Sequence, residues 1–248
     1  PLFAQYDLSS LPTVLSGAAP LDGQVAQAVD DRLGVRMIQG YGMTELSPVS
    51  HVIPTDRPDL PLSSVGLTLP NIECRLLDPA TGDDIDMPTE GESPQGELLC
   101  RGPNVMLGYL NNEKATRDVM TEDGFLRTGD IATVTWEGVV TVVDRLKELI
   151  KYKGYQIAPA ELEALLLTHP SIADAAVIGV PDDDGQEVPK AFVVLQDGAE
   201  LDEDGVMAFV AEHVAPYKKV RRVEFTSAIP KSSSGKILRK DLRALEHG

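Results

Sequence analysis

The segment Gln39–Glu45 concentrates residue types that bind phosphates and metal ions. It reads QGYGMTE, with two glycines, a hydroxyl and a carboxylate. Glycine lets a backbone approach a ligand closely, Thr44 can donate to a phosphate oxygen, and Glu45 can hold Mg²⁺. An ordinary turn has the same composition, so the segment alone leaves both interpretations open.

Two further segments offer a carboxylate and a lysine for nucleotide chemistry. Asp130 follows Arg127-Thr-Gly, where a carboxylate can accept both hydroxyls of a ribose, although Asp after Gly is also common in turns. Pro230–Lys236 (PKSSSGK) resembles a phosphate loop but has Ile237 where the Walker pattern requires Ser or Thr. It places a lysine on a hydroxyl-rich loop that opens a helix, and a solvated lysine is the plain alternative.

The fourth region of interest is Asp144–Gln156, which is unusually rich in cations for this chain. Its basic residues are Arg145, Lys147, Lys151 and Lys153, followed by Gly154. A solvated strand–turn–strand joining two domains would look the same. The rest of the chain is acidic, with a net charge of −17, so a local basic segment indicates a small anionic ligand.

Elements of two kinds must position these residues. Before residue 144 we expect a short strand from Leu11, then a helix from Asp22 with Val25, Ala28, Val29 and Leu33 on one face and Gly34 at its end. A small-residue loop at 39–45 comes next. Strand patterns then dominate, with an exposed acidic loop at 78–95. The predicted strands are 74–78, 96–101, 131–136 and 139–143.

After residue 156 helical and strand patterns alternate, which predicts a small α+β domain of about 100 residues. The fold class we expect is therefore α+β, with domains at 1–146 and 147–248. The predicted helices are 159–168, 203–214 and one from 237; the predicted strands are 173–180, 190–196 and 222–227.

Composition excludes several classes of protein. The acidic charge argues against non-specific nucleic-acid binding, and no apolar run approaches the roughly 20 residues of a membrane span. Cys74 and Cys100 lack the spacing of a metal site or a redox pair. Both lie in strand-like segments, so we expect buried thiols in a reducing compartment, which predicts a cytoplasmic protein.

Taken in order, the motifs resemble the adenylate-forming superfamily of acyl-CoA synthetases, peptide-synthetase adenylation domains and beetle luciferases. The similarity is greatest to the 4-coumarate and fatty-acyl CoA ligases. It implies a β-rich remainder of a large adenylation domain followed by a small mobile C-terminal domain. The segments that carry it are Ser16–Leu21, Gln39–Glu45, Gly96–Asn104, Gly108–Asn112, Arg127–Asp130, Asp144–Gln156 and Pro230–Lys236.

The resemblance implies a two-step reaction. A carboxylic acid is activated with ATP and Mg²⁺, diphosphate leaves, and the acyl group then passes from its adenylate to the thiol of CoA. In the first step, Thr44 would bind the α-phosphate, Glu45 the Mg²⁺, and Lys236 would stabilise the charge on phosphorus. Ala18, Gln39, Gly40 and Tyr41 would line the adenylate pocket, while Asp130 and Arg145 would hold the ribose.

The second step involves the cationic segment. By the same resemblance, Lys147 is the hinge about which the small domain rotates between half-reactions. Lys151 would replace Lys236 at the adenylate, and Lys153, Gly154 and Gln156 would meet CoA. The missing side chain of Gly154 would leave room for the pantetheine arm.

Several alternatives remain at this point. The family's phosphate loop would lie upstream of residue 1, so we expect the C-terminal half of a ligase. Transfer to a carrier-protein thiol, or luciferase-like oxidation, could replace CoA; Lys153-Gly-Tyr155 and the lack of carrier-domain sequence after residue 248 favour CoA. A truncated, non-catalytic chain that binds nucleotide weakly or pairs with another chain is the other class. Exposed apolar surface around residues 1–60 would then favour a homodimer or aggregation.

Overall fold

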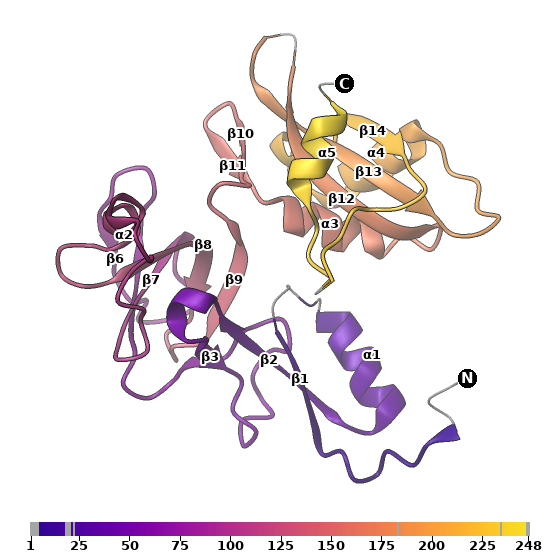
Figure 1. Ribbon diagram of the computed structural model, residues 1–248. Coiled ribbons are helices and arrows are strands. Elements are labelled where there is room, and N and C mark those ends of the chain that lie inside the picture. Colours follow the sequence, from indigo (N-terminus) through magenta and orange to yellow (C-terminus); the bar gives the residue numbers. More distant parts are fainter. Residues whose placement is uncertain (1–4, 18–20, 22, 183, 234, 247–248) are drawn as a thin grey trace. The chain divides into compact units, whose positions relative to one another are not determined.

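The computed structural model describes residues 5–17, 21, 23–182, 184–233 and 235–246, and it divides into two compact units (Figure 1). The first unit is Pro1–Val142 and the second is Val143–Gly248. The dividing point lies close to the predicted one, between residues 146 and 147. The structure mixes sheets and helices, which confirms the expected α+β class.

The first sheet of the first unit has four strands in the order β1-β2-β3-β4. Strands β1 and β2 are parallel, so the chain needs a crossover between them, and α1 (Gly23–Leu33) supplies it. The remaining pairs are antiparallel. The strands are β1 (Thr13–Ser16), β2 (Arg36–Gly42), β3 (Val49–Val52) and β4 (Leu67–Thr68).

Helix α1 ends before Gly34 as predicted, but the predicted apolar face is partly wrong. Ala26 is its buried residue, whereas Val25 and Ala28 are exposed. The Asp30 carboxylate accepts the backbone N–H of Met37 on β2, so the face toward the strand is the one that carries Ala26 and Asp30. A polar contact with the strand therefore set the rotation of the helix, and apolar periodicity could not reveal it.

Part of the segment predicted as the loop 39–45 is strand. Residues 39–42 complete β2, and a short 3₁₀ helix, η2 (Thr44–Leu46), follows. Gly42 is required here because a Cβ on it would lie 1.9 Å from the Pro48 carbonyl oxygen. The glycines thus serve close backbone packing within the sheet.

The second sheet has five strands in the order β6-β5-β7-β8-β9. Its core includes residues from segments next to the first sheet, since Leu46 of η2 and Val65, just before β4, pack with Leu98 and Leu126. Asn112 caps a short helix, α2 (Glu113–Val119), by accepting the N–H of Ala115. The strands are β5 (Glu73–Leu77), β6 (Asp84–Ile85), β7 (Gly96–Arg101), β8 (Leu126–Val134) and β9 (Val140–Arg145).

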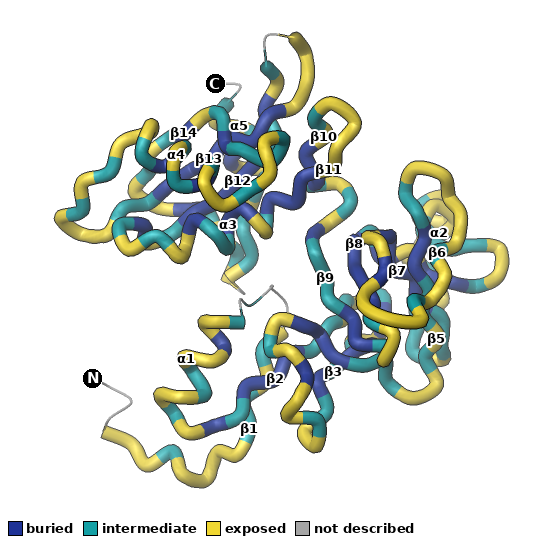
Figure 2. Tube along the Cα trace, turned by 180° about the vertical axis from the view of Figure 1, so that it is seen from behind, coloured by how far each residue is buried: buried dark blue, intermediate teal, exposed yellow. Residues whose placement is uncertain are grey.

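The second unit is a three-stranded sheet with helices on both faces. Strands β12 (Ile172–Pro181) and β13 (Glu187–Leu195) are antiparallel, and β14 (Arg222–Phe225) pairs parallel to β13. The two core strands are mostly buried in Figure 2.

Side chains of β12 alternate between two cores, as the period of two requires. Val177 packs with residues of α3 and α4, while Ile178 packs with Leu242 of α5. These helices are α3 (Pro159–Leu167), α4 (Glu203–His213) and α5 (Arg239–Leu245), close to the predicted ranges. A hairpin of β10 (Ile150–Tyr152) and β11 (Tyr155–Ile157) precedes α3. Across the described residues, the helices are too short or too polar to cross a membrane.

Candidate functional site

A hydrogen bond between Tyr41 and Asp130 joins the two sheets of the first unit. The Tyr41 hydroxyl, on β2, donates to Asp130 Oδ2 on β8 over 2.6 Å. Burial and the adjacent carboxylate raise the pKa of Tyr41, so the phenol stays protonated and acts as a donor. Asp130 is 7% exposed, so the sheet holds its carboxylate in a set orientation.

A β-bulge determines where Asp130 points. Glu97 pairs with Ile131 and Leu99 pairs with Arg127, so residues 128–130 of β8 face the single residue Leu98 of β7. Gly129 has a φ of +71°, which glycine adopts without strain. The Thr128 hydroxyl donates to the Leu98 carbonyl oxygen at 2.6 Å and accepts the Asp130 N–H at 3.1 Å. The predicted glycine turn is therefore a bulge inside a strand.

Gln39 is buried, and backbone groups occupy its side-chain amide. Its Nε2 donates to the carbonyl oxygens of Leu21 and Leu62, at 2.9 and 2.5 Å, and its Oε1 accepts the Leu21 N–H. The amide thus ties two loops to β2. Gly40 and Tyr41 follow it on the same strand, whereas Ala18 lies outside the described residues.

Thr44 and Glu45 begin the 3₁₀ helix that follows β2. Thr44 is exposed, and Glu45 accepts a hydrogen bond from the Tyr109 hydroxyl at 2.7 Å. That bond raises the pKa of Tyr109. Oxygen ligands from one carboxylate, combined with substrate phosphates and waters, are what Mg²⁺ usually takes, so Glu45 fits the metal. Tyr109 lies 64 residues away, in the segment Gly108–Asn112 that carries part of the family resemblance, but no site role was predicted for it.

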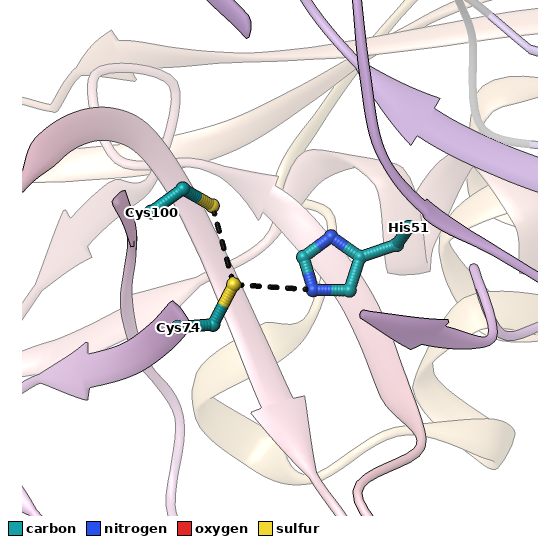
Figure 3. Close-up of side chains that lie close together, drawn as sticks. All are labelled: His51, Cys74 and Cys100. Atoms are coloured by element: carbon teal, nitrogen blue, oxygen red, sulfur yellow. Dashed lines mark hydrogen bonds between the residues drawn. The ribbon is translucent and has the colours of Figure 1, made fainter. Parts of the chain in front are cut away.

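Three further groups lie next to this region: His51 of β3, Cys74 of β5 and Cys100 of β7 (Figure 3). The two sulfur atoms are 3.5 Å apart, and Cys74 Sγ is also 3.5 Å from His51 Nε2. A hydrogen bond from the Cys100 thiol lowers the pKa of Cys74 to about 5, and the same bond raises that of Cys100. The Tyr41 ring centroid is 5.8 Å from that of His51. The expectation of buried thiols is correct for Cys100, whereas Cys74 is half-buried; both are free.

In the second unit, Asp144 anchors the start of the cationic segment. Its carboxylate accepts the backbone N–H groups of Arg145 and Ala160, at 2.7 and 2.8 Å. Ala160 opens α3, so Asp144 caps that helix from a distant point of the chain. Burial raises the pKa of Asp144. Arg145 and Lys147 are exposed, at the end of β9 and in the turn after it.

The remaining cations of the segment lie on the β10–β11 hairpin. Lys151 pairs with Gln156, and Tyr152 pairs with Tyr155 across a two-residue turn. Lys153 and Gly154 form that turn with φ values of +49° and +83°, the pattern of a type I′ hairpin. All four predicted thiolation residues are exposed. The backbone conformation is thus sufficient to explain Gly154.

Lys236 belongs to a tight hydrogen-bonded loop and not to the helix. Lys231 and Ile237 form an isolated bridge, and Ser232 N–H donates to the Lys236 carbonyl oxygen at 2.9 Å. Lys231 Nζ also pairs with Asp174 at 2.6 Å. Helix α5 begins at Arg239. The expectation that Lys236 directly opens a helix was therefore wrong, because a short segment that includes the bridged residue Ile237 lies between the two.

A surface depression of about 570 Å³ in the second unit contains none of the predicted site residues. Its lining is Leu195, Ala199, Glu200, Leu201 and Asp202.

Comparison with known proteins identifies the family. Residues 1–110 match the model of the AMP-binding enzymes, and residues 161–236 match that of the AMP-binding enzyme C-terminal domain. The chain belongs to the AMP-binding enzyme family. The match covers parts of both units of this AMP-binding enzyme, which agrees with the resemblance drawn from its motifs.

Relatives of this AMP-binding enzyme are CoA ligases. It is 49% identical over 96% of its length to peroxisomal OPC-8:0-CoA ligase 1 of Arabidopsis thaliana. It is 48% identical over 98% to probable 4-coumarate–CoA ligase 1 of Dictyostelium discoideum. The chain spans only 43% of the length of each of these relatives.

Solved structures show the same fold. ATP-bound MatB from Rhodopseudomonas palustris matches 93% of this AMP-binding enzyme with a TM-score of 0.86 and 31% identity, over 44% of its own chain. Amide bond synthetase McbA from Marinactinospora thermotolerans matches 99% with a TM-score of 0.87 and 33% identity, over 49% of its own chain. The fold of the described units is therefore that of adenylating enzymes.

Proposed function

We propose that this chain forms part of an ATP-dependent, AMP-forming acyl-CoA synthetase. The reaction converts a carboxylic acid, ATP and CoA into acyl-CoA, AMP and diphosphate by way of an acyl-adenylate. The observation that carries the proposal is the Asp130 carboxylate, buried and aimed by a bulge beside the Gln39–Glu45 segment. A fixed carboxylate suits the adjacent hydroxyls of a ribose. The similarity to CoA ligases supports the choice of reaction.

In this proposal residues 1–146 are the C-terminal part of the large AMP-binding domain and carry the nucleotide site. Asp130, together with Arg145, holds the ribose, and Tyr41 keeps the Asp130 carboxylate in place by donating to one oxygen. Thr44 is exposed and contacts the α-phosphate. Because backbone groups occupy the Gln39 side chain, its segment lines the adenylate pocket mainly through backbone atoms and Gly40.

Glu45 would hold Mg²⁺ in this arrangement. The ion supplies positive charge next to the phosphates, and the Tyr109 hydroxyl orients the carboxylate that binds it. Tyr109 remains a donor because its pKa is raised, so it does not compete with the metal as an anion.

Residues 147–248 would form the small C-terminal domain and serve both half-reactions. Lys236 stabilises the charge that builds up on the α-phosphorus during adenylation, by electrostatics and without covalent work. Lys147 is the hinge. Lys151 then serves the adenylate during thiolation, and Lys153, Gly154 and Gln156 meet CoA on the exposed hairpin.

The proposal extends to a role in fatty-acid metabolism and to a cytoplasmic location, and both remain predictions. One relative is named as peroxisomal. The predicted homodimer has one supporting feature: Leu15 and Val25 of the first unit are 60% and 50% exposed. Such apolar groups favour association with another surface.

Calorimetric titration tests the proposed nucleotide site directly. The chain should bind a non-hydrolysable acyl-AMP analogue, and Asp130→Asn and Asp130→Ala should weaken that binding by at least about 10-fold, since each loses a charged hydrogen-bond acceptor. Asp118→Ala, on the exposed face of α2, is the control and should bind normally. Unchanged binding by a folded Asp130→Asn variant would refute the assignment. No binding by the unaltered chain would favour the non-catalytic alternative.

A further inference from the structure

We propose that His51, Cys74 and Cys100 form a binding site for Zn²⁺ within the first unit. These residues come from three strands, β3, β5 and β7, and the proposed nucleotide chemistry does not use them. The inference is independent of the proposed function, because it concerns a separate set of ligands.

The distances among the three groups are close to those of a tetrahedral zinc site. With Zn–S bonds of about 2.3 Å and Zn–N bonds of about 2.0 Å, ligand atoms are roughly 3.5–3.8 Å apart. The Cys74–Cys100 and Cys74–His51 separations are both 3.5 Å, and all three ligand atoms lie within 4.8 Å of one another. Only a small side-chain adjustment is needed to bring the ligand atoms of Cys100 and His51 to a similar separation.

The scaffold holds the ligands firmly. Cys74 and Cys100 are directly opposite each other on paired antiparallel strands, so their separation is set by the sheet. His51 and Cys100 are each 0% exposed. Cys74 is half-buried and marks the side from which a cation, and a water as fourth ligand, would enter.

A second hydrogen bond orients the imidazole for metal binding. Ser50 Oγ lies 2.9 Å from His51 Nδ1 and is itself fully buried. When this hydroxyl accepts the Nδ1 proton, the lone pair is on Nε2, the nitrogen that faces Cys74 Sγ. Histidines that bind metals are typically fixed by such a partner on the other nitrogen.

The charge balance favours a divalent thiophilic cation. Each thiol releases its proton to solvent as its Zn–S bond forms, so the site binds Zn²⁺ as two thiolates and one neutral imidazole, and no oxidant is required. The two thiolates neutralise the charge of the ion among the three strands. Mg²⁺ and Ca²⁺ prefer oxygen ligands, so they should not compete for this site.

Metal titration of the reduced full chain tests the site. Competition with a chromophoric chelator should show one tightly bound Zn²⁺ per chain, and Co²⁺ should produce a thiolate-to-cobalt charge-transfer band with tetrahedral d–d bands. Zn²⁺ should also protect Cys74 from alkylation, and a chelator should restore reactivity. A cobalt spectrum of octahedral oxygen type, or alkylation that Zn²⁺ leaves unchanged, would overturn the proposal.

Variants distinguish this site from adventitious binding. Cys74→Ser should lower Zn²⁺ affinity by at least about 100-fold, and Ser50→Ala, which removes only the orienting partner, by about 10–100-fold. His213→Gln is the matched control, because it removes an exposed histidine of the second unit and should leave affinity unchanged. Equal affinity in the Cys74→Ser and unaltered chains refutes the site. Because the alkylation test uses the unaltered chain, the result does not depend on the variants folding.

Discussion

At the scale of single residues, the first unit depends on a polar contact between strands that are distant in sequence. Tyr41 and Asp130 are separated by 89 positions, yet their hydrogen bond is 2.6 Å. A buried carboxylate without a donor would be costly, so the phenol stabilises the fold as well as the orientation of a ligand group. The two roles can be separated because stability and ligand binding are measured independently.

If the Tyr41–Asp130 hydrogen bond stabilises the fold, loss of the Tyr41 hydroxyl should reduce stability more than loss of the Tyr109 hydroxyl. Tyr41→Phe should lower the free energy of unfolding by about 1.5–3 kcal/mol, because a buried hydrogen bond to a charged group is lost. Urea unfolding measures this. Tyr109→Phe removes the same type of bond from an exposed tyrosine and should lower the free energy of unfolding by about 1 kcal/mol or less. Similar losses in the two variants would contradict the account.

The sequence predicted some of these residues and could not predict others. Residue type and local spacing indicate Asp130 and Gln39–Glu45 as candidates, and their role in nucleotide binding stays a prediction. A separation of 26 positions argues against Cys74 and Cys100 as a metal pair, but pairing of β5 with β7 places them opposite each other. His51 carried no signal at all. Spacing rules detect ligands within one loop, whereas these ligands are assembled by strand register.

At the scale of elements, the turn of the β10–β11 hairpin constrains its own sequence. Lys153 and Gly154 both have positive φ values, which only glycine and a few polar residues adopt cheaply. A Cβ at position 154 would meet nothing within 4 Å. The backbone conformation alone is thus sufficient to favour glycine, and the room for CoA expected from the family resemblance stays a prediction.

Two substitutions of Gly154 distinguish a conformational requirement from a requirement for room beside CoA. Gly154→Ala should destabilise the folded chain by about 1–2 kcal/mol, and Gly154→Asn by less, because Asn tolerates the left-handed conformation better. Thermal unfolding measures both. If Gly154 instead serves to leave room for CoA, the larger Asn should impair CoA binding more than Ala does. That order would favour the original expectation.

A buried ion pair connects three elements of the second unit. Arg239 of α5 donates to both carboxylate oxygens of Glu163, at 2.8 and 2.7 Å, and Glu163 of α3 also accepts the Val177 N–H of β12. Burial raises the pKa of Glu163. Both side chains are largely shielded, with exposures of 13% and 9%.

Removal of the Glu163 carboxylate should reduce the stability of the fold far more than removal of the Glu161 carboxylate on the same helix. Glu163→Ala should lower the free energy of unfolding by about 3 kcal/mol, because it leaves Arg239 buried and uncompensated. Glu161→Ala, on the same helix, breaks only the more exposed pair with Lys218 and should cost about 1 kcal/mol or less. Chemical denaturation compares the two. Equal losses of stability would show that the buried ion pair contributes no more than the exposed one.

Elements of the second unit were easier to predict than those of the first. Strands β12 and β13 have long apolar runs, and α3 and α4 have clear starts, so the pattern determined them. The short β3 and β4, and helix α2, were missed because two to seven residues carry too little periodicity. The bulge at Thr128–Asp130 was interpreted as a turn, since glycine is typical of both.

At the scale of the whole molecule, the proposed half-reactions assign different lysines to different steps. In a preparation that forms acyl-AMP, Lys236→Ala should slow adenylation by about 10²–10³, the loss expected for one transition-state stabiliser. It should spare thioester formation from supplied acyl-AMP. Diphosphate release and thioester formation are measured separately. Lys240→Ala, an exposed lysine of α5, is the control. Equal losses in both steps would argue against the role of Lys236.

The hinge assignment predicts the opposite selectivity. Lys147→Pro should stiffen the turn after β9, since proline fixes φ and restricts the residue before it. Adenylation should survive while thioester formation is severely reduced. The same two assays measure this, with Lys147→Ala as a control for the lost charge. Should both steps survive in the proline variant, the hinge lies elsewhere.

The cap that Asp144 places on α3 has a consequence for how this family can diversify. Its contact with Ala160 closes the chain on itself, so residues 145–159 leave and return to nearly the same point. Ile150 and Ile157 anchor the base of the hairpin in the core, while the tip at 151–156 is largely exposed. Because the closure is made by groups outside the tip, substitutions and exchanges there carry little risk to folding, except at the two turn positions with positive φ, Lys153 and Gly154. Natural variation can therefore change the chemistry offered by this hairpin while selection for stability acts on other residues, and tips from related enzymes should be exchangeable by grafting.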